Sequence, residues 1–112
     1  MNPPTIDQAT FTELQEAAGS DFVQELVQTF LEEAPVMLQE LREALAAGDA
    51  DAFRRAAHSL KSNSLTFGAL PLGALARELE QGPPGTGTPA ALDALAAEYA
   101  RAAAALTELA RG

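Results

Sequence analysis

Apolar residues recur every three or four positions along nearly the whole chain, which is the spacing that places them on one face of an α-helix. Alanine, leucine and glutamate dominate and β-branched residues are sparse, so intrinsic propensity agrees with the pattern. The pattern therefore predicts an all-α fold. Glycine and proline interrupt it and divide the chain into five predicted helices, at about 10–18, 20–47, 50–67, 71–81 and from 89 onwards.

Several residues at these boundaries fit the rules for helix ends. Thr10 and Glu13 have the spacing of a capping box, and Ser20 can cap the second helix. Asp49 is a natural N-cap for the third helix. Pro35 lies inside the second helix, where it removes one backbone donor and should produce a kink.

The last connection carries the only linker-like composition in the chain, GPPGTGTP at 82–89. It is too short to separate two domains and indicates an exposed loop, with Thr88 and Pro89 as cap and first residue of the last helix. Four long amphipathic helices with short connections favour an antiparallel up-down-up-down four-helix bundle with a short extra N-terminal helix. We expect residues 1–112 to form a single domain.

Composition and charge narrow the functional classes. The chain has no cysteine, which excludes disulfides and thiolate metal sites. Seven lysines and arginines oppose sixteen acidic residues, for a formal net charge of −9; nucleic-acid binding needs clustered basic residues instead. No apolar run approaches the roughly 20 residues that span a bilayer, and the N-terminus lacks the pattern of a signal peptide. We expect a cytoplasmic protein that binds neither nucleic acid nor a membrane.

The stretch AHSLKS contains the only histidine, His58, and the only lysine, Lys61. On a wheel at about 100° per residue, the third helix has one core face, formed by Phe53, Ala56, Ala57, Leu60, Ser64 and Phe67. His58 points roughly 140° away from the centre of that face, so we expect it to be exposed. Its neighbours at helical spacing share that exposed side; they are Arg54, Lys61, Ser62 and Leu65.

An exposed histidine can have several chemical roles, or none. A metal site is weakly supported without a second histidine or a cysteine, and a serine-type triad needs a pocket that a bundle flank does not offer. Glycine loops that cradle phosphates are also missing. A nucleophilic role remains, because neutral imidazole has one free lone pair. His58 could then accept a phosphoryl group, while the Lys61 ammonium stabilises charge on the transferring oxygens.

The run AHSLKSNSLTFGALPLGALARELE, at 57–80, resembles the histidine-containing phosphotransfer (HPt) domain of multistep phosphorelays. The family pattern is His-x-Leu-Lys-Gly, then Gly-Ala about five residues later, then a helix with spaced leucines. The corresponding residues here are His58, Leu60, Lys61, Gly68, Ala69, Leu72, Leu75 and Leu79. The sequence departs from the pattern at Ser62, where many members have glycine; serine is still small enough to leave His58 accessible.

The resemblance implies a function and a set of partners. His58 would receive a phosphoryl group from the phospho-aspartate of a response-regulator receiver domain and pass it to the aspartate of a second receiver. The domain would be a monomeric phosphoryl carrier with no kinase activity and no cofactor, since Mg²⁺ belongs to the receiver. A hybrid histidine kinase would act upstream. Lys61 would lie beside the phosphate, and Arg54, Ser62 and Leu65 would contribute to docking.

Glu80 is a further candidate at the end of the fourth helix. It lies roughly 80° from the centre of that helix's leucine stripe, and it can face His58 if the third and fourth helices pack antiparallel. A carboxylate that accepts the Nδ1–H of His58 would fix the tautomer that leaves Nε2 free to attack. In some relatives, the matching position holds a glutamine or glutamate that accepts this bond. The alternative is a solvated glutamate at a helix end.

Three other functional classes remain open. In the dimerisation and phosphoacceptor domain of a sensor kinase, glutamate usually follows the histidine and proline comes soon after; HSLKSNS has neither. The chain could also be a phosphoacceptor module cut from a larger hybrid or chemotaxis-type kinase. The last class is a plain helical protein-interaction module with a fortuitous histidine.

Overall fold

The computed structural model describes residues 4–83 and 85–111 and contains five helices but no strand within these ranges, as the sequence pattern predicts. The chain is therefore all-α. The helices, in chain order, are α1 (Gln8–Ala18), α2 (Ser20–Ala47), α3 (Ala50–Thr66), α4 (Leu70–Gln81) and α5 (Pro89–Arg111).

The predicted cap of α1 is wrong. Asp7, not Thr10, is the N-cap, and its carboxylate accepts a hydrogen bond from the Thr10 backbone N–H at 3.2 Å. The helix therefore begins before Thr10, because Asp7 supplies the acceptor three residues earlier and also accepts from the Thr10 hydroxyl. Glu13 consequently lies inside the helix and closes no capping box.

The predicted cap of α2 is also wrong, because Ser20 is the first residue of the helix. Gly19 alone separates α1 from α2, and no side chain caps this helix start. Other boundary predictions are confirmed: Asp49 accepts from the Ala52 backbone N–H at 3.1 Å, and Thr88 Oγ1 accepts from Ala91 at the same distance. The α2 helix continues through Pro35, and a kink there stays a prediction.

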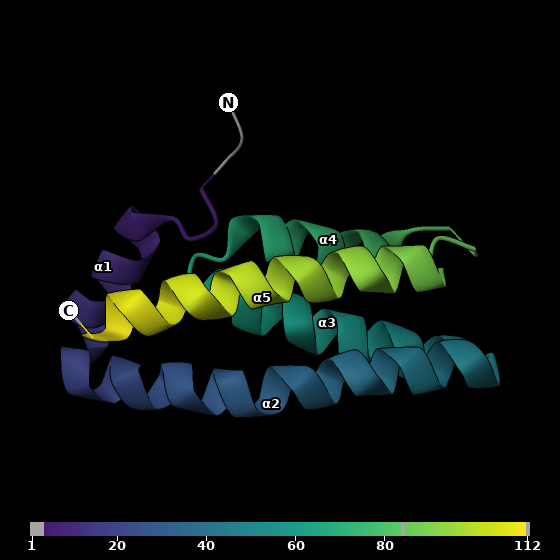
Figure 1. Ribbon diagram of the computed structural model, residues 1–112, viewed down its shortest axis with the longest axis horizontal. Coiled ribbons are helices and arrows are strands. Elements are labelled where there is room, and N and C mark those ends of the chain that lie inside the picture. Colours follow the sequence, from purple (N-terminus) through teal and green to yellow (C-terminus); the bar gives the residue numbers. More distant parts are fainter. Residues whose placement is uncertain (1–3, 84, 112) are drawn as a thin grey trace.

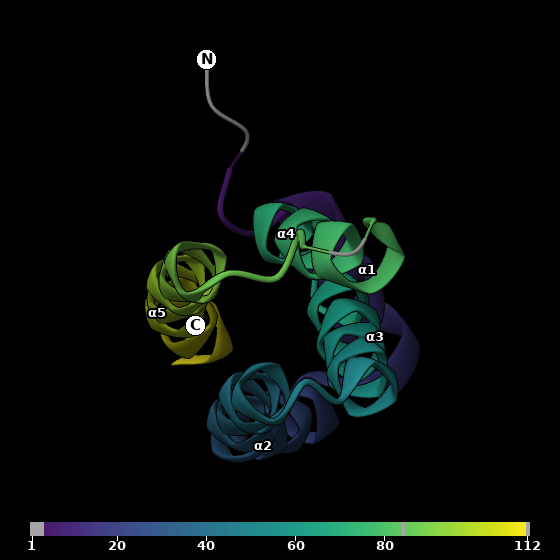
Figure 2. The same ribbon diagram turned by 90° about the vertical axis from the view of Figure 1, so that its right-hand side faces the viewer.

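The four long helices lie side by side along the longest axis of the molecule (Figure 1) and surround a common centre when seen end-on (Figure 2). Helix α2 contacts α3 and α5, and α4 contacts the same two helices, while α1 packs against α2. Each long helix contributes leucine to the core, where burial stabilises the fold by about 1.5–3 kcal/mol per side chain. The fully buried leucines are Leu41, Leu60, Leu72, Leu95 and Leu106.

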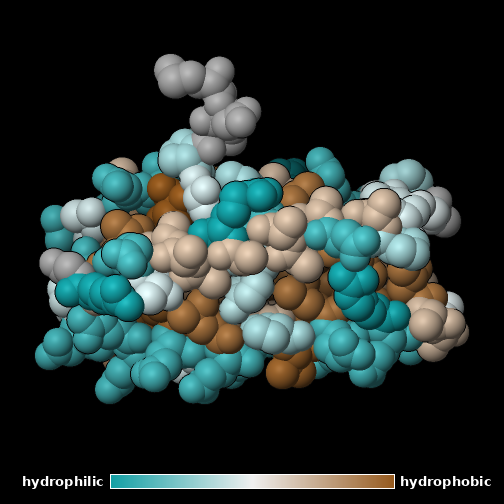
Figure 3. Space-filling model, in the orientation of Figure 1, coloured by the Kyte–Doolittle hydropathy of each residue, from teal (hydrophilic) through white to brown (hydrophobic). Residues whose placement is uncertain are grey.

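The outer surface of α2 is acidic. The lower edge of the molecule in Figure 3, where α2 runs, is largely hydrophilic. Five exposed glutamates lie on this helix, namely Glu25, Glu32, Glu33, Glu40 and Glu43. The amphipathic pattern of α2 thus separates a core-facing stripe from a solvated acidic side.

The core face of α3 matches its prediction. Ala56, Ala57, Leu60, Ser64 and Phe67 are buried, and the partly buried Phe53 packs against the same core. The buried Ser64 hydroxyl is satisfied because it donates to the Leu60 carbonyl at 2.6 Å. This burial leaves the opposite side of α3 facing outward.

Gly68 allows the N-terminal segment to close over the corner between α3 and α4. It has a φ of +79°, and a Cβ at this position would lie 2.8 Å from the Asp7 carbonyl oxygen. The Asp7 N–H donates to the Gly68 carbonyl at 2.7 Å. Ile6 and Phe11, which belong to the same N-terminal segment as Asp7, are buried. A side chain at this corner would separate the two segments, so glycine fixes one end of the α3–α4 pair.

Candidate functional site

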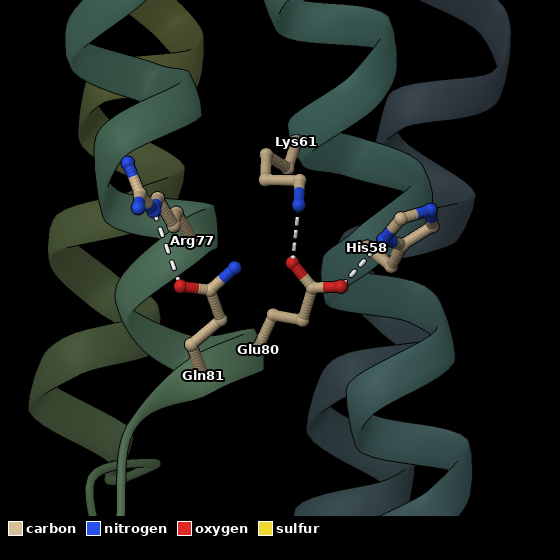
Figure 4. A network of polar contacts seen from close by, with 5 residues as sticks. All are labelled: His58, Lys61, Arg77, Glu80 and Gln81. Atoms are coloured by element: carbon tan, nitrogen blue, oxygen red, sulfur yellow. Dashed lines mark hydrogen bonds and ion pairs between the residues drawn. The ribbon is translucent and has the colours of Figure 1, made fainter.

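His58 lies on the outward side of α3, and 59% of its side chain is exposed. This confirms the position expected from the helical wheel. Its Nδ1 points toward Glu80 on α4, as Figure 4 shows, and lies 2.5 Å from Glu80 Oε2. Because an ionised carboxylate can only accept hydrogen bonds, Nδ1 is the donor in this contact. Nε2 of a neutral His58 is then the nitrogen with the free lone pair.

Glu80 is not a solvated residue at a helix end. Only 17% of its side chain is exposed, and its two carboxylate oxygens contact two different residues of α3. Oε2 faces His58, while Oε1 accepts a hydrogen bond from Lys61 Nζ at 2.6 Å. In Figure 4 the carboxylate lies between the imidazole and the ammonium. The close packing of α4 on α3 therefore brings all three side chains together.

Lys61 is more buried than its place on the wheel indicates. Its side chain is 17% exposed, whereas the sequence led us to expect an exposed lysine beside His58. The difference arises because α4 covers this side of α3 and Glu80 binds the ammonium. A helical wheel cannot reveal this, since it contains no information about the neighbouring helix.

The ion pair with Lys61 shapes the ionisation of Glu80. The Lys61 hydrogen bond is the largest cause that lowers the pKa of Glu80 below its ordinary value. Partial burial of the carboxyl group opposes this shift, and the contact with His58 lowers the pKa further. Glu80 is consequently ionised near neutral pH and can act as an acceptor for both neighbours.

The three predicted docking residues are all exposed on α3. Arg54 forms a long ion pair with Asp51 at 3.5 Å on the same helix, and Leu65 is one of the few large apolar side chains that are strongly exposed, at 43%. Ser62 is exposed between His58 and Leu65. These residues lie around His58 along the helix, while Glu80 forms its polar contact and Lys61 binds the other oxygen of that carboxylate.

Sequence reasoning missed Gly73 as part of this surface. A Cβ on Gly73 would lie 2.7 Å from Leu65 Cδ2, so the glycine in α4 makes room for the Leu65 side chain. An isolated glycine inside a helical pattern costs about 1 kcal/mol relative to alanine. That unexplained cost was the available signal that another side chain packs there.

Neither a metal centre nor a membrane span is apparent in the described part of the chain. Residues 4–83 and 85–111 contain no group of three histidine, cysteine, aspartate or glutamate side chains placed to hold a metal ion. Within the same ranges, every helix is too short or too polar to cross a bilayer.

Comparisons with known proteins agree with this site. The family model of the Hpt domain matches residues 25–105. The crystal structure of histidine-containing phosphotransfer protein B (HptB) from Pseudomonas aeruginosa PAO1 is similar, with a TM-score of 0.86 and 29% sequence identity. The match covers 98% of this chain and 97% of that one. A comparison with curated proteins gave no match. The chain belongs to the Hpt domain family, and its function is histidine phosphotransfer in a phosphorelay.

Proposed function

We propose that His58 is the phosphoacceptor and that it exchanges phosphoryl groups with aspartates of receiver domains. One observation carries this assignment: the only imidazole of the chain is exposed, and its Nδ1 is held by a carboxylate. The exposed ring is accessible to a partner, and the Nδ1 contact leaves Nε2 as the nucleophile.

Phosphoryl transfer to His58 forms one bond to phosphorus and breaks another. The Nε2 lone pair attacks the phosphorus of the acyl phosphate, the P–N bond forms, and the P–O bond to the receiver carboxylate breaks. The carboxylate leaves with its electron pair, and the ring acquires positive charge. Glu80, which contacts Nδ1–H, stabilises that charge. Attack by the aspartate of a second receiver reverses these bond changes. Mg²⁺ held by the receiver would neutralise the phosphoryl oxygens.

Lys61 can support this reaction in two ways. The sequence predicts direct stabilisation of the phosphoryl oxygens by its ammonium. Its hydrogen bond to Glu80 Oε1 supports a second role, in which Lys61 holds the carboxylate that orients His58. We favour the positioning role, because it accounts for the low exposure of the lysine side chain.

We further infer a cytoplasmic, monomeric carrier without kinase activity, which receives its phosphoryl group from a receiver attached to a hybrid histidine kinase. Arg54, Ser62 and Leu65 would contact the receiver around His58, since all three are exposed on α3. Residues 1–112 would form one domain, in which the four long helices alternate in direction as an up-down-up-down bundle. The short connections between successive helices support this arrangement.

The proposal is tested by incubating the protein with each phosphorylated receiver domain of the same genome. We expect at least one receiver to label the wild type and none to label His58→Gln, whose melting temperature should be unchanged because the site is exposed. The label should be lost in acid and survive base, as a phosphoramidate does. An acid-stable label, or undiminished labelling of His58→Gln, would contradict the assignment.

A parallel assay with ATP and the catalytic domains of the histidine kinases of the same genome separates the alternative functions. A phosphoacceptor module of a chemotaxis-type kinase would take its phosphoryl group from ATP through that kinase's catalytic domain, and faster labelling by this route than by any receiver would favour it. A plain interaction module would acquire no label by either route.

A further inference from the structure

A pocket lies at the end of the molecule nearest Glu80, between the α2–α3 turn and the loop that joins α4 to α5. Its volume is about 660 Å³, which is within the range of pockets that bind partner groups or small molecules. Phe53, Leu45 and Leu79 provide its apolar lining. A Cβ on Gly87 would lie 2.7 Å from the Phe53 ring, so the loop backbone packs directly on the ring and forms one wall of the pocket.

The charged groups around this pocket already have partners. Arg54 pairs with Asp51, Glu80 pairs with Lys61, and the carboxylate of Asp49 caps α3. A charged occupant would therefore meet compensated charges and would lose its hydration without gaining a strong new contact. The chemistry of the lining favours an uncharged, apolar occupant.

The pocket is continuous with the surface around His58, because Arg54 and Glu80 belong to both. A partner of ordinary size buries about 800 Å² on each side, which corresponds to a radius of roughly 16 Å if the contact is circular. At about 1.5 Å per residue along α3, Arg54 lies about 6 Å and Ala50 about 12 Å from His58. A receiver centred on His58 therefore reaches the mouth of the pocket.

We propose that this pocket is a docking subsite that takes an apolar side chain, aromatic or aliphatic, from the receiver domain. Such an anchor in a preformed pocket would contribute affinity and partner choice, whereas His58 and its polar contacts carry the chemistry. The inference rests on the proposed function, since it requires a receiver as the partner, but it assigns the receiver a second point of contact away from the imidazole.

The test uses two matched substitutions and the receiver that transfers fastest to the wild type. Ala50→Trp places a large side chain at the exposed first residue of α3, in the pocket lining. Ala46→Trp makes the same change at an exposed position of α2 that is not part of the lining. We expect Ala50→Trp alone to raise the receiver concentration for half-maximal transfer by about tenfold. The rate at saturation, and labelling by phosphoramidate, which needs no docking, should stay at the wild-type level.

Equal effects of the two tryptophans, or no effect of either, would overturn the proposal. Nuclear Overhauser contacts between the wild type and the receiver test it independently of mutation: we expect contacts from a receiver side chain to the methyl groups of Leu45 and Leu79. If these methyl groups respond to a neutral probe such as toluene but not to the receiver, the pocket binds small molecules and the docking proposal is wrong. If no receiver transfers a phosphoryl group at all, the proposed function is wrong as well. Normal transfer to Ala50→Trp would contradict only the docking role of the pocket and would leave the proposed function intact.

Discussion

The central residue of the site is Glu80, a single carboxylate that contacts two side chains of α3. His58 lies on one of its oxygens and Lys61 on the other. Removal of Lys61 leaves the carboxylate with the imidazole alone, and removal of Glu80 frees both. Because the three side chains form one network, their contributions to the transfer rate should not be additive.

A double-mutant cycle distinguishes the two roles of Lys61. We expect Lys61→Ala and Glu80→Ala each to slow phosphotransfer by about tenfold or more, equivalent to roughly 1.4 kcal/mol of barrier or more. Glu80→Gln should keep most of the rate, because its amide oxygen still accepts from Nδ1–H. If Lys61 acts by holding Glu80, the double alanine variant should be no slower than Glu80→Ala alone. Rapid-mixing measurements of transfer from a phosphorylated receiver supply the four rates.

Two further measurements check the physical basis of that cycle. Nitrogen chemical shifts of the neutral His58 imidazole should show the Nδ1–H tautomer in the wild type and a mixture of tautomers in Glu80→Ala. Lys61→Ala should lower the melting temperature, since it leaves a poorly exposed carboxylate without its ammonium. If the slowdown in the double variant equals the product of the slowdowns in the two single variants, Lys61 instead acts directly on the phosphoryl group.

The lowered pKa of Glu80 also predicts how stability depends on pH. The folded protein holds this proton more weakly than the unfolded chain, whose glutamate has an ordinary pKa of 4.5. Glu80 therefore stabilises the fold fully above about pH 4.5, and this contribution is lost as the pH falls through the lower folded-state pKa. Urea denaturation of the wild type and Glu80→Gln should show a stability difference that is constant near neutral pH and shrinks below pH 4.5. A difference that is independent of pH down to about pH 3 would contradict the shift.

At the scale of the helix, α3 separates a buried face from a functional face. Leu60 is fully buried, whereas Leu65 is 43% exposed and packs on Gly73 of α4. Leu60→Asp buries a charge without a partner, so it should destabilise the protein by roughly 3 kcal/mol or more. Leu65→Asp should cost about 1 kcal/mol or less, but it should raise the receiver concentration for half-maximal transfer by about tenfold. Thermal unfolding and transfer kinetics of the two variants test this division.

Equal loss of stability in the two variants would show that Leu65 belongs to the core. Normal transfer kinetics in a stable Leu65→Asp protein would instead remove this residue from the docking surface. Phosphoramidate labelling of His58 provides the control in both cases, because it reports an intact acceptor without requiring a partner.

At the scale of the whole molecule, the excess of negative charge opposes compaction. The formal net charge is −9, and two of the ion pairs, Asp51–Arg54 and Glu108–Arg111, join exposed side chains only three positions apart within one helix. Exposed pairs of this kind contribute at most about 1 kcal/mol each. Repulsion among the remaining acidic residues, including those on the outer side of α2, is therefore the larger long-range term.

We accordingly expect salt to stabilise the protein at neutral pH. Raising the ionic strength from about 0.01 to 0.15 M shortens the screening length from about 30 to 8 Å, so the melting temperature at pH 7 should rise. Near pH 4.3, where the net charge is close to zero, the same change in salt should have little effect. Calorimetric scans at both pH values and both ionic strengths supply the comparison. A melting temperature that falls with salt at pH 7 would show that attractive ion pairs dominate instead.

Much of the fold follows from interactions within three or four residues of the chain. The helical spacing of apolar residues determined the five helices, and Asp49 and Thr88 marked two of their starts because a cap bonds to a backbone group within the next turn. Local rules also failed where two acceptors competed, as at Asp7 and Thr10, because spacing alone does not decide which acceptor starts the helix. The exposure of His58 needed only the direction of the core face of α3.

The contacts that complete the site depend on the placement of α4 relative to α3. The wheel put Glu80 on a flank, but its distances to His58 and Lys61 follow from the rotation and offset of two packed helices. Those are set by the buried leucines and by the close corner at Gly68, which join residues far apart in the chain. The sequence by itself thus determined the helices and the exposed imidazole, because both arise from local periodicity. Only the tertiary structure decided the burial of Lys61 and the pocket beside Glu80, because each is formed by side chains that packing brings together.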